Sequence, residues 1–263
     1  MKLSIFSLAA ILCVTAWGWM RASKPAHAAN ARTPVLVELF TSEGCSSCPP
    51  ADRLLQKLDQ QPIPGAEIIV LSEHVDYWNH IGWKDPYSAH SYSERQSAYA
   101  TRFDLDSVYT PQMVVDGATE FVGSDSSLAE KSFQKALRNP KIPLSLASIS
   151  LDSSNTLHAR LETGTLESSF GLAKAEIYVA VALNHAESQV SAGENSGHRL
   201  VHVSVVRSLT KLGAVSQGQS FAGDAQIKLE PGSDARNLRL IAFLQEPRQG
   251  RVLGAASLPV VAK

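Results

Sequence analysis

The first part of the sequence combines short apolar runs with one helical spacing of apolar residues. Residues 35–40 form a run rich in strand-forming side chains, which predicts a buried central strand. Residues 51–58 place three leucines on one side of a helix, and the Pro and Gly residues at 62–65 end it. Residues 68–71 form a second buried strand. This order predicts a βαβ unit.

Further along the chain the pattern becomes one of alternating strands. Residues 93–103 and a segment ending near 137 have helical character, and Asp116-Gly117 predicts a hairpin turn. Beyond Pro140, apolar and polar residues alternate in several short segments with Gly, Ser, Asn and Asp between them. These segments are 144–151, 157–161, 175–183, 200–209, 225–229 and 238–244. We therefore predict an α/β domain over residues 33–140 and a mostly β, sandwich-like domain over residues 143–263.

The N-terminal residues have the pattern of an export signal. Lys2 is followed by a mostly apolar stretch over 3–20, and Ala26-His27-Ala28 provides the small residues of a cleavage site. We predict a signal peptide over residues 1–28, and an exported protein that is periplasmic or secreted. No stable membrane insertion is expected after cleavage, and an uncleaved membrane anchor is the alternative.

The composition limits the expected classes of partner and the number of cysteines in the mature chain. Apolar residues make up 44% and charged residues 19% of the chain, with a net charge of −1, which indicates a soluble globular protein. No segment is strongly basic, so nucleic acid is not an expected partner. Of the three cysteines, Cys13 leaves with the signal peptide, and the mature protein keeps Cys45 and Cys48.

Cys45 and Cys48 lie between the predicted buried strand and the predicted helix. Unpaired N–H groups and the dipole at a helix start stabilise a thiolate, which is the species that attacks a disulfide. We expect Cys45 to be the exposed nucleophile and Cys48 to resolve the mixed disulfide, with no bound cofactor or metal. Two alternatives stay open at this stage. They are a zinc site completed by histidines of residues 74–90, and a permanently closed structural disulfide.

The order of strand, CxxC, helix, strand and a Thr-Pro before a hairpin resembles the thioredoxin fold. The resemblance implies a cis Thr110–Pro111 peptide whose backbone holds an incoming chain. It also implies that Glu38 is a buried acid that takes the proton from Cys48, although a purely structural hydrogen bond at Glu38 is an equal alternative. Departures from thioredoxin include Gly44 in place of an aromatic residue, and a longer distance from Cys48 to the Thr-Pro.

Longer motifs resemble one family more closely. They are residues 37–52, with the run VELFTSEGCSSCPPAD, together with residues 74–78, 109–112 and 193–195 and the later positions Leu200, His202 and 205–207. They are similar to a secreted bacterial thioredoxin-like family of unknown function, numbered twelve twenty-three. The resemblance implies a thioredoxin-like first domain and leaves the reaction open.

Two further segments are candidates for the site. Residues 74–92 are rich in aromatic and histidine side chains, and we expect Trp78, His74 and Asp76 to contribute to substrate binding, with packing in a small core as the alternative. His74 and Asp76 would share one face of a strand. The polar turn at 193–198 reaches the cysteines or is simply a tight hairpin with glycines at positive φ, and the second interpretation is favoured.

Together these observations predict a thiol–disulfide oxidoreductase that acts through Cys45 and Cys48 on a thiol- or disulfide-bearing protein partner. Two other functions remain. One is a protein- or peptide-binding module with a structural disulfide, and the other is a periplasmic copper chaperone that uses both cysteines and nearby histidines.

Overall fold

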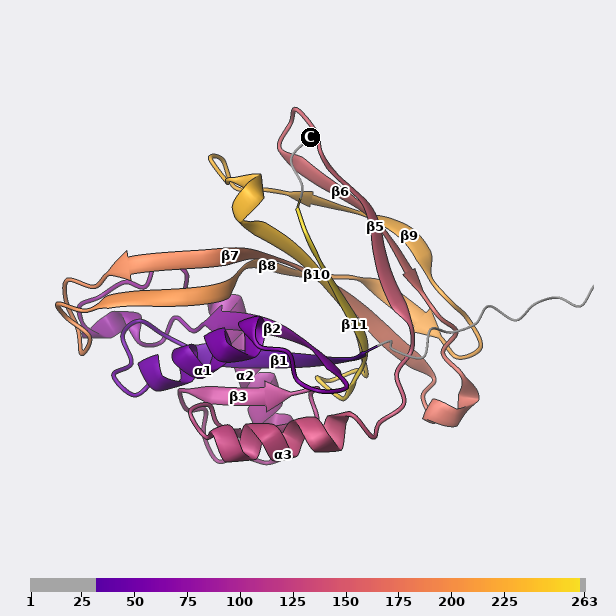
Figure 1. Ribbon diagram of the computed structural model, residues 1–263, viewed down its shortest axis with the longest axis horizontal. Helices are drawn as coiled ribbons and strands as arrows, with labels where there is room; N and C mark the ends of the chain where they lie inside the picture. Colours follow the sequence, from indigo (N-terminus) through magenta and orange to yellow (C-terminus); the bar gives the residue numbers. More distant parts are fainter. Residues whose placement is uncertain (1–31, 261–263) are drawn as a thin grey trace, which may run out of the picture. The chain divides into compact units, whose positions relative to one another are not determined.

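A computed structural model describes residues 32–260, which belong to one compact unit (Figure 1). The predicted signal peptide, its cleavage site and Cys13 lie outside the described residues. Within the described part of the chain, no helix is both long enough and apolar enough to cross a membrane.

The predicted βαβ unit is confirmed. Strand β1 (Thr33–Thr41), helix α1 (Pro49–Gln60) and strand β2 (Ala66–His74) follow one another, and the two strands pair in parallel along their whole length. Strands β3 (Gln112–Val115) and β4 (Thr119–Val122) form the hairpin predicted around Asp116-Gly117, and β3 pairs antiparallel with β1. Helices α2 (His90–Phe103) and α3 (Ser126–Ala136) complete this part.

Strand β1 buries both of its faces. Val35, Val37 and Leu39 pack with residues of α1 and α3, whereas Leu36 and Phe40 point toward the other face, where α2 lies. Side chains alternate between the two faces of a strand, so Glu38 shares the α2 side with Leu36 and Phe40. This alternation decides which titratable groups can serve the cysteines.

The later strands build two sheets. Strands β5 (Leu144–Leu151), β6 (Thr156–Thr163) and β9 (Ala222–Lys228) form a three-stranded sheet. Strands β7 (Lys174–Gln189), β8 (Arg199–Ser216), β10 (Leu238–Gln245) and β11 (Val252–Pro259) instead join the first four strands. The resulting mixed sheet has eight strands in the order β11-β10-β7-β8-β2-β1-β3-β4. Short 3-10 turns lie at Asn79–Ile81, Ser168–Phe170 and Ala235–Asn237.

The predicted fold class, a thioredoxin-like α/β domain followed by a separate β-sandwich domain, is therefore wrong. One eight-stranded sheet contains strands from both sides of residues 140–143, and β8 meets β2 at the pair Ser72 and Val205. The second half contributes strands to the same sheet as the cysteine-bearing βαβ unit.

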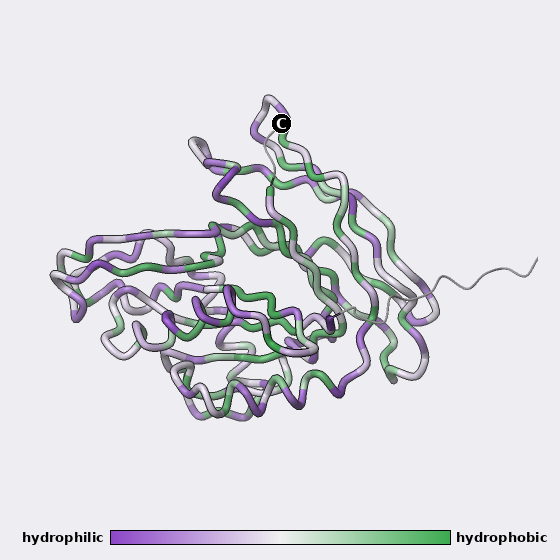
Figure 2. The backbone as a smooth tube through the Cα atoms, in the orientation of Figure 1, coloured by the Kyte–Doolittle hydropathy of each residue, from purple (hydrophilic) through white to green (hydrophobic). Residues whose placement is uncertain are grey.

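The physical reason is visible in β10. Its residues Ile241 and Phe243 pack into the core that contains Leu36 and Leu71, while Leu240 and Leu244 pack against the three-stranded sheet. Burying an aliphatic or aromatic side chain contributes about 1.5–3 kcal/mol, so a strand that is apolar on both faces is stable only between two layers. Figure 2 shows this hydrophobic character along the central strands.

Candidate functional site

The cysteine pair lies in the loop between β1 and the start of α1, as the sequence predicts. Cys45 and Cys48 form a disulfide with their Cα atoms 5.4 Å apart, which confirms the predicted bond. Cys48 immediately precedes the helix, and its carbonyl oxygen accepts from the N–H groups of Ala51 and Asp52. Pro49 occupies the first helical turn, where a missing N–H costs nothing.

The expectation that Cys45 is exposed is not met. Both cysteines have an exposed fraction of 0%, although Ser46 and Ser47 between them are exposed. The Ser47 hydroxyl lies 3.3 Å from the sulfur of Cys45. The disulfide is therefore close to the surface, but neighbouring segments cover it.

The first covering segment is the turn at residues 190–198, between β7 and β8. The carboxylate of Glu194 accepts hydrogen bonds from the backbone N–H and the hydroxyl of Ser46, at 3.0 and 2.7 Å. The buried amide of Asn195 donates to the carbonyl oxygens of Glu43 and Cys45, at 2.9 and 3.0 Å. Gly193 also has the positive φ of a tight turn, so this turn combines both alternatives that its sequence suggests.

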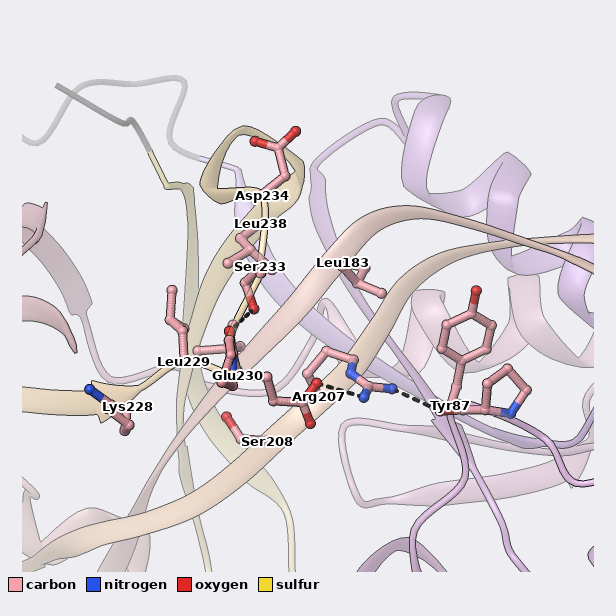
Figure 3. Close-up of a pocket in the computed structure, with 14 residues that line it drawn as sticks. Tyr87, Leu183, Arg207, Ser208, Lys228, Leu229, Glu230, Ser233, Asp234 and Leu238 are labelled. Atoms are coloured by element: carbon pink, nitrogen blue, oxygen red, sulfur yellow. Dashed lines mark hydrogen bonds and ion pairs between the residues drawn. The ribbon is translucent and has the colours of Figure 1, made fainter. Parts of the chain in front are cut away.

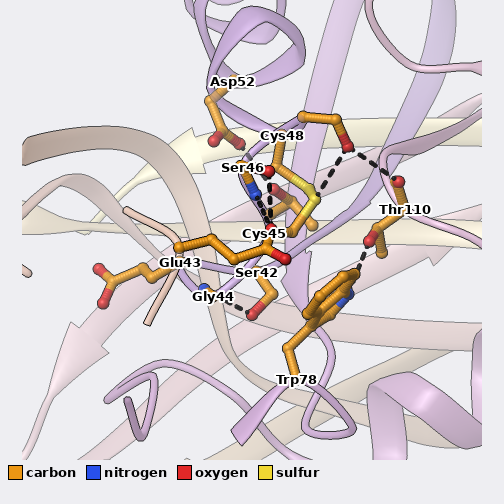
Figure 4. Close-up of a disulfide and its surroundings, with 12 residues drawn as sticks. Ser42, Glu43, Gly44, Cys45, Ser46, Cys48, Asp52, Trp78 and Thr110 are labelled. Atoms are coloured by element: carbon orange, nitrogen blue, oxygen red, sulfur yellow. Dashed lines mark hydrogen bonds between the residues drawn. A yellow bond between two sulfur atoms is a disulfide. The ribbon is translucent and has the colours of Figure 1, made fainter. Parts of the chain in front are cut away.

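Trp78 and Thr110, which come from two different segments, lie on another side of the disulfide (Figure 4). The Trp78 indole N–H donates to the Thr110 hydroxyl at 2.8 Å, and the Thr110 carbonyl oxygen accepts from the Ser47 hydroxyl at 3.4 Å. The Thr110–Pro111 peptide is cis, which confirms that prediction. A Cβ atom at Gly44 would lie 3.1 Å from the Cβ of Trp78, so this tryptophan takes the space beside Gly44.

His74 and Asp76 do not share a face, because β2 ends at His74. His74 is buried, with its Nδ1 2.7 Å from the carboxylate of Asp85. Asp85 also accepts from the backbone N–H of Glu43 at 2.8 Å, which connects His74 to the cysteine loop. Asp76 instead accepts from the hydroxyl of Ser93 in α2 at 2.6 Å. Although burial opposes it, the His74 contact and the backbone hydrogen bonds lower the pKa of Asp85.

Glu38 is bound on the α2 side of the sheet. Its carboxylate accepts from Arg95 at 2.6 Å and from the hydroxyl of Tyr99 at 2.5 Å. Burial, together with the negative charge of Glu38, raises the pKa of the neighbouring Glu73 well above its ordinary value. Side chains alternate along β1, so Glu38 falls on the face with Leu36 and Phe40 and not on the face that packs against α1.

Three buried polar residues form a further cluster near the start of α1, namely Asp52, His202 and Glu43. Asp52 accepts from the Thr41 hydroxyl at 3.0 Å, and its second oxygen lies 3.8 Å from Nδ1 of His202. The other ring nitrogen of His202 lies 3.4 Å from the carboxylate of Glu43. Burial lowers the pKa of His202, but the two carboxylates outweigh it and raise that pKa to about 10.

A sequence signal existed for part of this cluster. Asp52 follows Cys48 by four positions in a predicted helix, and residues at that spacing are neighbours on a helix surface. His202 stands in one of the matched family motifs, but no local pattern links it to the cysteines. Only the pairing of β8 with β2 brings His202 to α1.

Metal binding finds no geometric support among residues 32–260, where no group of three or more His, Cys, Asp or Glu side chains could hold an ion. The two cysteines are bonded to each other, and His74 is engaged with Asp85. The expectation that no cofactor is needed stays a prediction.

A cleft of about 430 Å³ opens elsewhere, between the β7–β8 strands and the segment at 228–238 (Figure 3). Arg207, one of its charged lining residues, donates to the carbonyl oxygen of Pro86 and to the carboxylate of Glu230. The residues that line it include neither cysteine nor Asp52, Glu194 or Asn195. Because Arg207 is already paired, the cleft is a less direct candidate than the disulfide.

Comparison with known proteins decides the family. A family described as protein of unknown function, DUF1223, matches residues 36–245. The chain belongs to the DUF1223 family. This result confirms the family resemblance of the sequence motifs, and no curated protein matches the chain significantly.

Two solved structures resemble this DUF1223 protein over most of its length. Protein AGR_C_4864 from Agrobacterium tumefaciens is 24% identical, with a TM-score of 0.67 over 89% of this chain and 97% of that one. HBP35 of Porphyromonas gingivalis is 15% identical, with a TM-score of 0.60 over 88% of this chain and 76% of that one. At these identities the likeness concerns the fold alone.

Proposed function

We propose that this DUF1223 protein catalyses thiol–disulfide exchange through Cys45 and Cys48, with a thiol- or disulfide-bearing protein as partner. The observation that carries the proposal is the position of the disulfide. It closes across the start of α1, and the sulfur of Cys45 lies directly behind the exposed Ser47. A disulfide placed at a helix start is where a released thiolate is stabilised.

The surroundings of Cys45 support this chemistry. The Ser47 hydroxyl, 3.3 Å from the sulfur, is able to donate to a thiolate once the disulfide opens. The backbone N–H of Ser46 is held by the Glu194 carboxylate and becomes free when the turn at 190–198 moves away. A partner's extended chain would bind along the exposed side of the Thr110–Pro111 segment, as the resemblance implies.

The reaction requires the cover to open. The hydrogen bonds of Glu194 and Asn195 hold the turn over the disulfide, and each of the two buried bonds of Asn195 contributes about 0.5–1.5 kcal/mol. An opening free energy of a few kcal/mol leaves a small but sufficient open population. We therefore propose that the partner reacts with the open form.

A redox titration and a trapping experiment test the proposal. In dithiothreitol or glutathione buffers, we expect a reduction potential between about −120 and −270 mV, the range of exchange catalysts. In a Cys48→Ala variant, Cys45 should retain a disulfide-linked protein partner, whereas Cys45→Ala should retain none. A potential below about −300 mV together with an empty trap would contradict the proposal.

The second candidate function is a protein- or peptide-binding module with a structural disulfide. The complete burial of both cysteines favours it. The same titration separates the two functions, because a structural bond resists reduction by the glutathione pool, and a binding module would keep its ligand after both cysteines are replaced by alanine.

We also propose that the protein is exported to the periplasm after cleavage behind Ala28. Mass spectrometry of the protein from a periplasmic fraction tests this, since the mature chain should begin at residue 29. An intact N-terminus in a membrane fraction would support the uncleaved anchor instead.

A further inference from the structure

When the disulfide opens, the buried sulfur of Cys48 needs a source of a proton. Its exposed fraction is 0%, so a thiolate formed there has no water beside it in the closed structure. An isolated buried charge is costly, and a thiolate in such a place takes up a proton. The proton must come from a group in the same buried region and return to it when the disulfide closes again.

Glu38, which the resemblance suggests for this role, lies on the wrong face of the sheet. Its carboxylate is engaged by Arg95 and Tyr99 on the α2 side, whereas Cys48 begins α1. On the opposite face of β1, which packs against α1, Thr41 follows Leu39, and the Thr41 hydroxyl donates to Asp52. The face that holds Cys48 therefore has its own buried acid.

Asp52 is one helical turn beyond Cys48. Its backbone N–H donates to the Cys48 carbonyl oxygen at 3.1 Å, which fixes the two residues in one helical turn. Residues at this spacing have Cβ atoms roughly 5–6 Å apart. Figure 4 shows the Asp52 side chain on the opposite side of the disulfide from Trp78, away from the covering tryptophan.

His202 holds a proton beside Asp52. Its exposed fraction is 1%, and its two ring nitrogens lie 3.8 Å from Asp52 and 3.4 Å from Glu43. Within residues 32–260, neither nitrogen has a hydrogen-bond partner of normal geometry, so the two carboxylates act on the imidazole mainly through their charge. The other titratable groups that face it are His74, with ring centroids 4.7 Å apart, and Tyr87, at 6.1 Å.

We propose that Asp52 and His202 form the proton-holding pair of Cys48, an inference that rests on the proposed exchange function. In the forward direction, a partner thiolate attacks the sulfur of Cys45, a new S–S bond forms, and the Cys45–Cys48 bond breaks. Cys48 leaves as a thiolate and takes the proton of the pair. A second thiolate of the partner then attacks the partner sulfur, and Cys45 is released as a thiolate. The partner dithiol is oxidised to a disulfide, and the protein disulfide is reduced.

Reoxidation of the reduced protein allows the role of Asp52 and His202 to be measured. When the reduced protein reacts with oxidised glutathione, Cys45 forms a mixed disulfide and glutathione leaves. The pair then removes the proton from Cys48, whose thiolate attacks Cys45 and expels the second glutathione. The lifetime of the mixed disulfide reports the proton transfer at Cys48 and not the initial attack.

The test compares Asp52→Asn with a matched control on the same helix. Asp59→Asn removes an equally charged residue that pairs with Arg239, two turns beyond the site. Reduced proteins are mixed with oxidised glutathione between pH 5 and 9, quenched by alkylation, and analysed by mass. We expect the mixed disulfide of Asp52→Asn to persist about tenfold longer or more at pH 7, with a flattened pH profile, because general acid–base catalysis contributes about 10²–10⁴-fold.

The outcomes separate this inference from the proposed function. Asp52→Glu should restore most of the rate, and Asp59→Asn should match the parent protein. If Asp52→Asn resolves its mixed disulfide with the parent rate and pH profile, the proton-holding pair is refuted while exchange stands. If the parent protein forms no mixed disulfide at all, the exchange function and the pair fall together. An unfolding curve for each variant identifies a rate change that comes only from a loosened fold, which would also count against the pair.

Discussion

The amide of Asn195 provides the sharpest test of the cover over the disulfide. Its side chain is buried and donates to the carbonyl oxygens of Glu43 and Cys45. Asn195→Ala removes both hydrogen bonds and leaves two carbonyl oxygens without that donor. At about 1 kcal/mol for each bond, the closed turn loses roughly 2 kcal/mol relative to the open turn.

That loss converts directly into a rate. When a reductant reaches the disulfide only after the turn opens, the observed rate is proportional to the open population. A change of 1.4 kcal/mol is a factor of ten, so we expect the disulfide of Asn195→Ala to be reduced about 30 times faster than that of the parent protein.

The assay follows reduction by dithiothreitol with alkylation and mass analysis. Ser196→Ala is the matched control, because Ser196 lies in the same turn and is exposed, and its hydroxyl donates to the carbonyl oxygen of Ser191. Its rate should stay within about twofold of the parent protein, as a surface substitution of small energetic effect. If Asn195→Ala loses stability and yet is reduced at the parent rate, the reductant arrives by another route and the covering role of the turn is wrong.

Three further predictions concern the charges and the backbone. The pKa of His202 is raised from 6.5 to about 10, so its contribution to stability is present below pH 6.5 and is lost as the pH rises toward 10. Urea unfolding should show the free energy of unfolding fall by up to about 5 kcal/mol over that range. Hydrogen bonds from the hydroxyl and the backbone N–H of Ser46 lower the pKa of Glu194, so the turn should loosen as the pH falls below about 4.5. Reduction of the parent disulfide by a phosphine should therefore accelerate below that pH, and Glu194→Gln should abolish this acceleration. Gly117→Ala should lower the free energy of unfolding by roughly 2–4 kcal/mol, because its φ is +60° and a Cβ would lie 2.2 Å from the carbonyl oxygen of Gly250. Gly218→Ala, at a φ of +77° with open space around it, should lower it by only about 1 kcal/mol in the same urea unfolding measurement.

Local sequence patterns identified the elements that carry the cysteines. The apolar run at 35–40, the leucine spacing at 51–58 and the second run at 68–71 predict β1, α1 and β2 correctly, because short-range periodicity reflects which face of an element is buried. The spacing of Cys45 and Cys48 is compatible with their disulfide, since two cysteines with two residues between them at a helix start lie close enough for the bond.

Predictions that depend on long-range packing were less successful. The alternating segments of the second half indicate strands, and strands are found there, but the pattern does not say which sheet they join. The apolar residues on both faces of β10 were the available signal that it lies between two layers. The same limit applies to Glu38, because a shift of one position along a strand places a side chain on the opposite face of the sheet, and the motif alone does not settle that position.

The sequence by itself determined the βαβ unit, the cysteine pair at its centre, and the family. Only the tertiary structure decided that one sheet unites both halves of the chain, that the turn at 190–198 bonds to the backbone of Cys45, and that His202 lies beside Asp52. The physical reason is distance along the chain. Asn195 and Cys45 are separated by 150 positions, and no periodicity spans that gap, whereas burial of two apolar faces fixes how the strands between them are arranged.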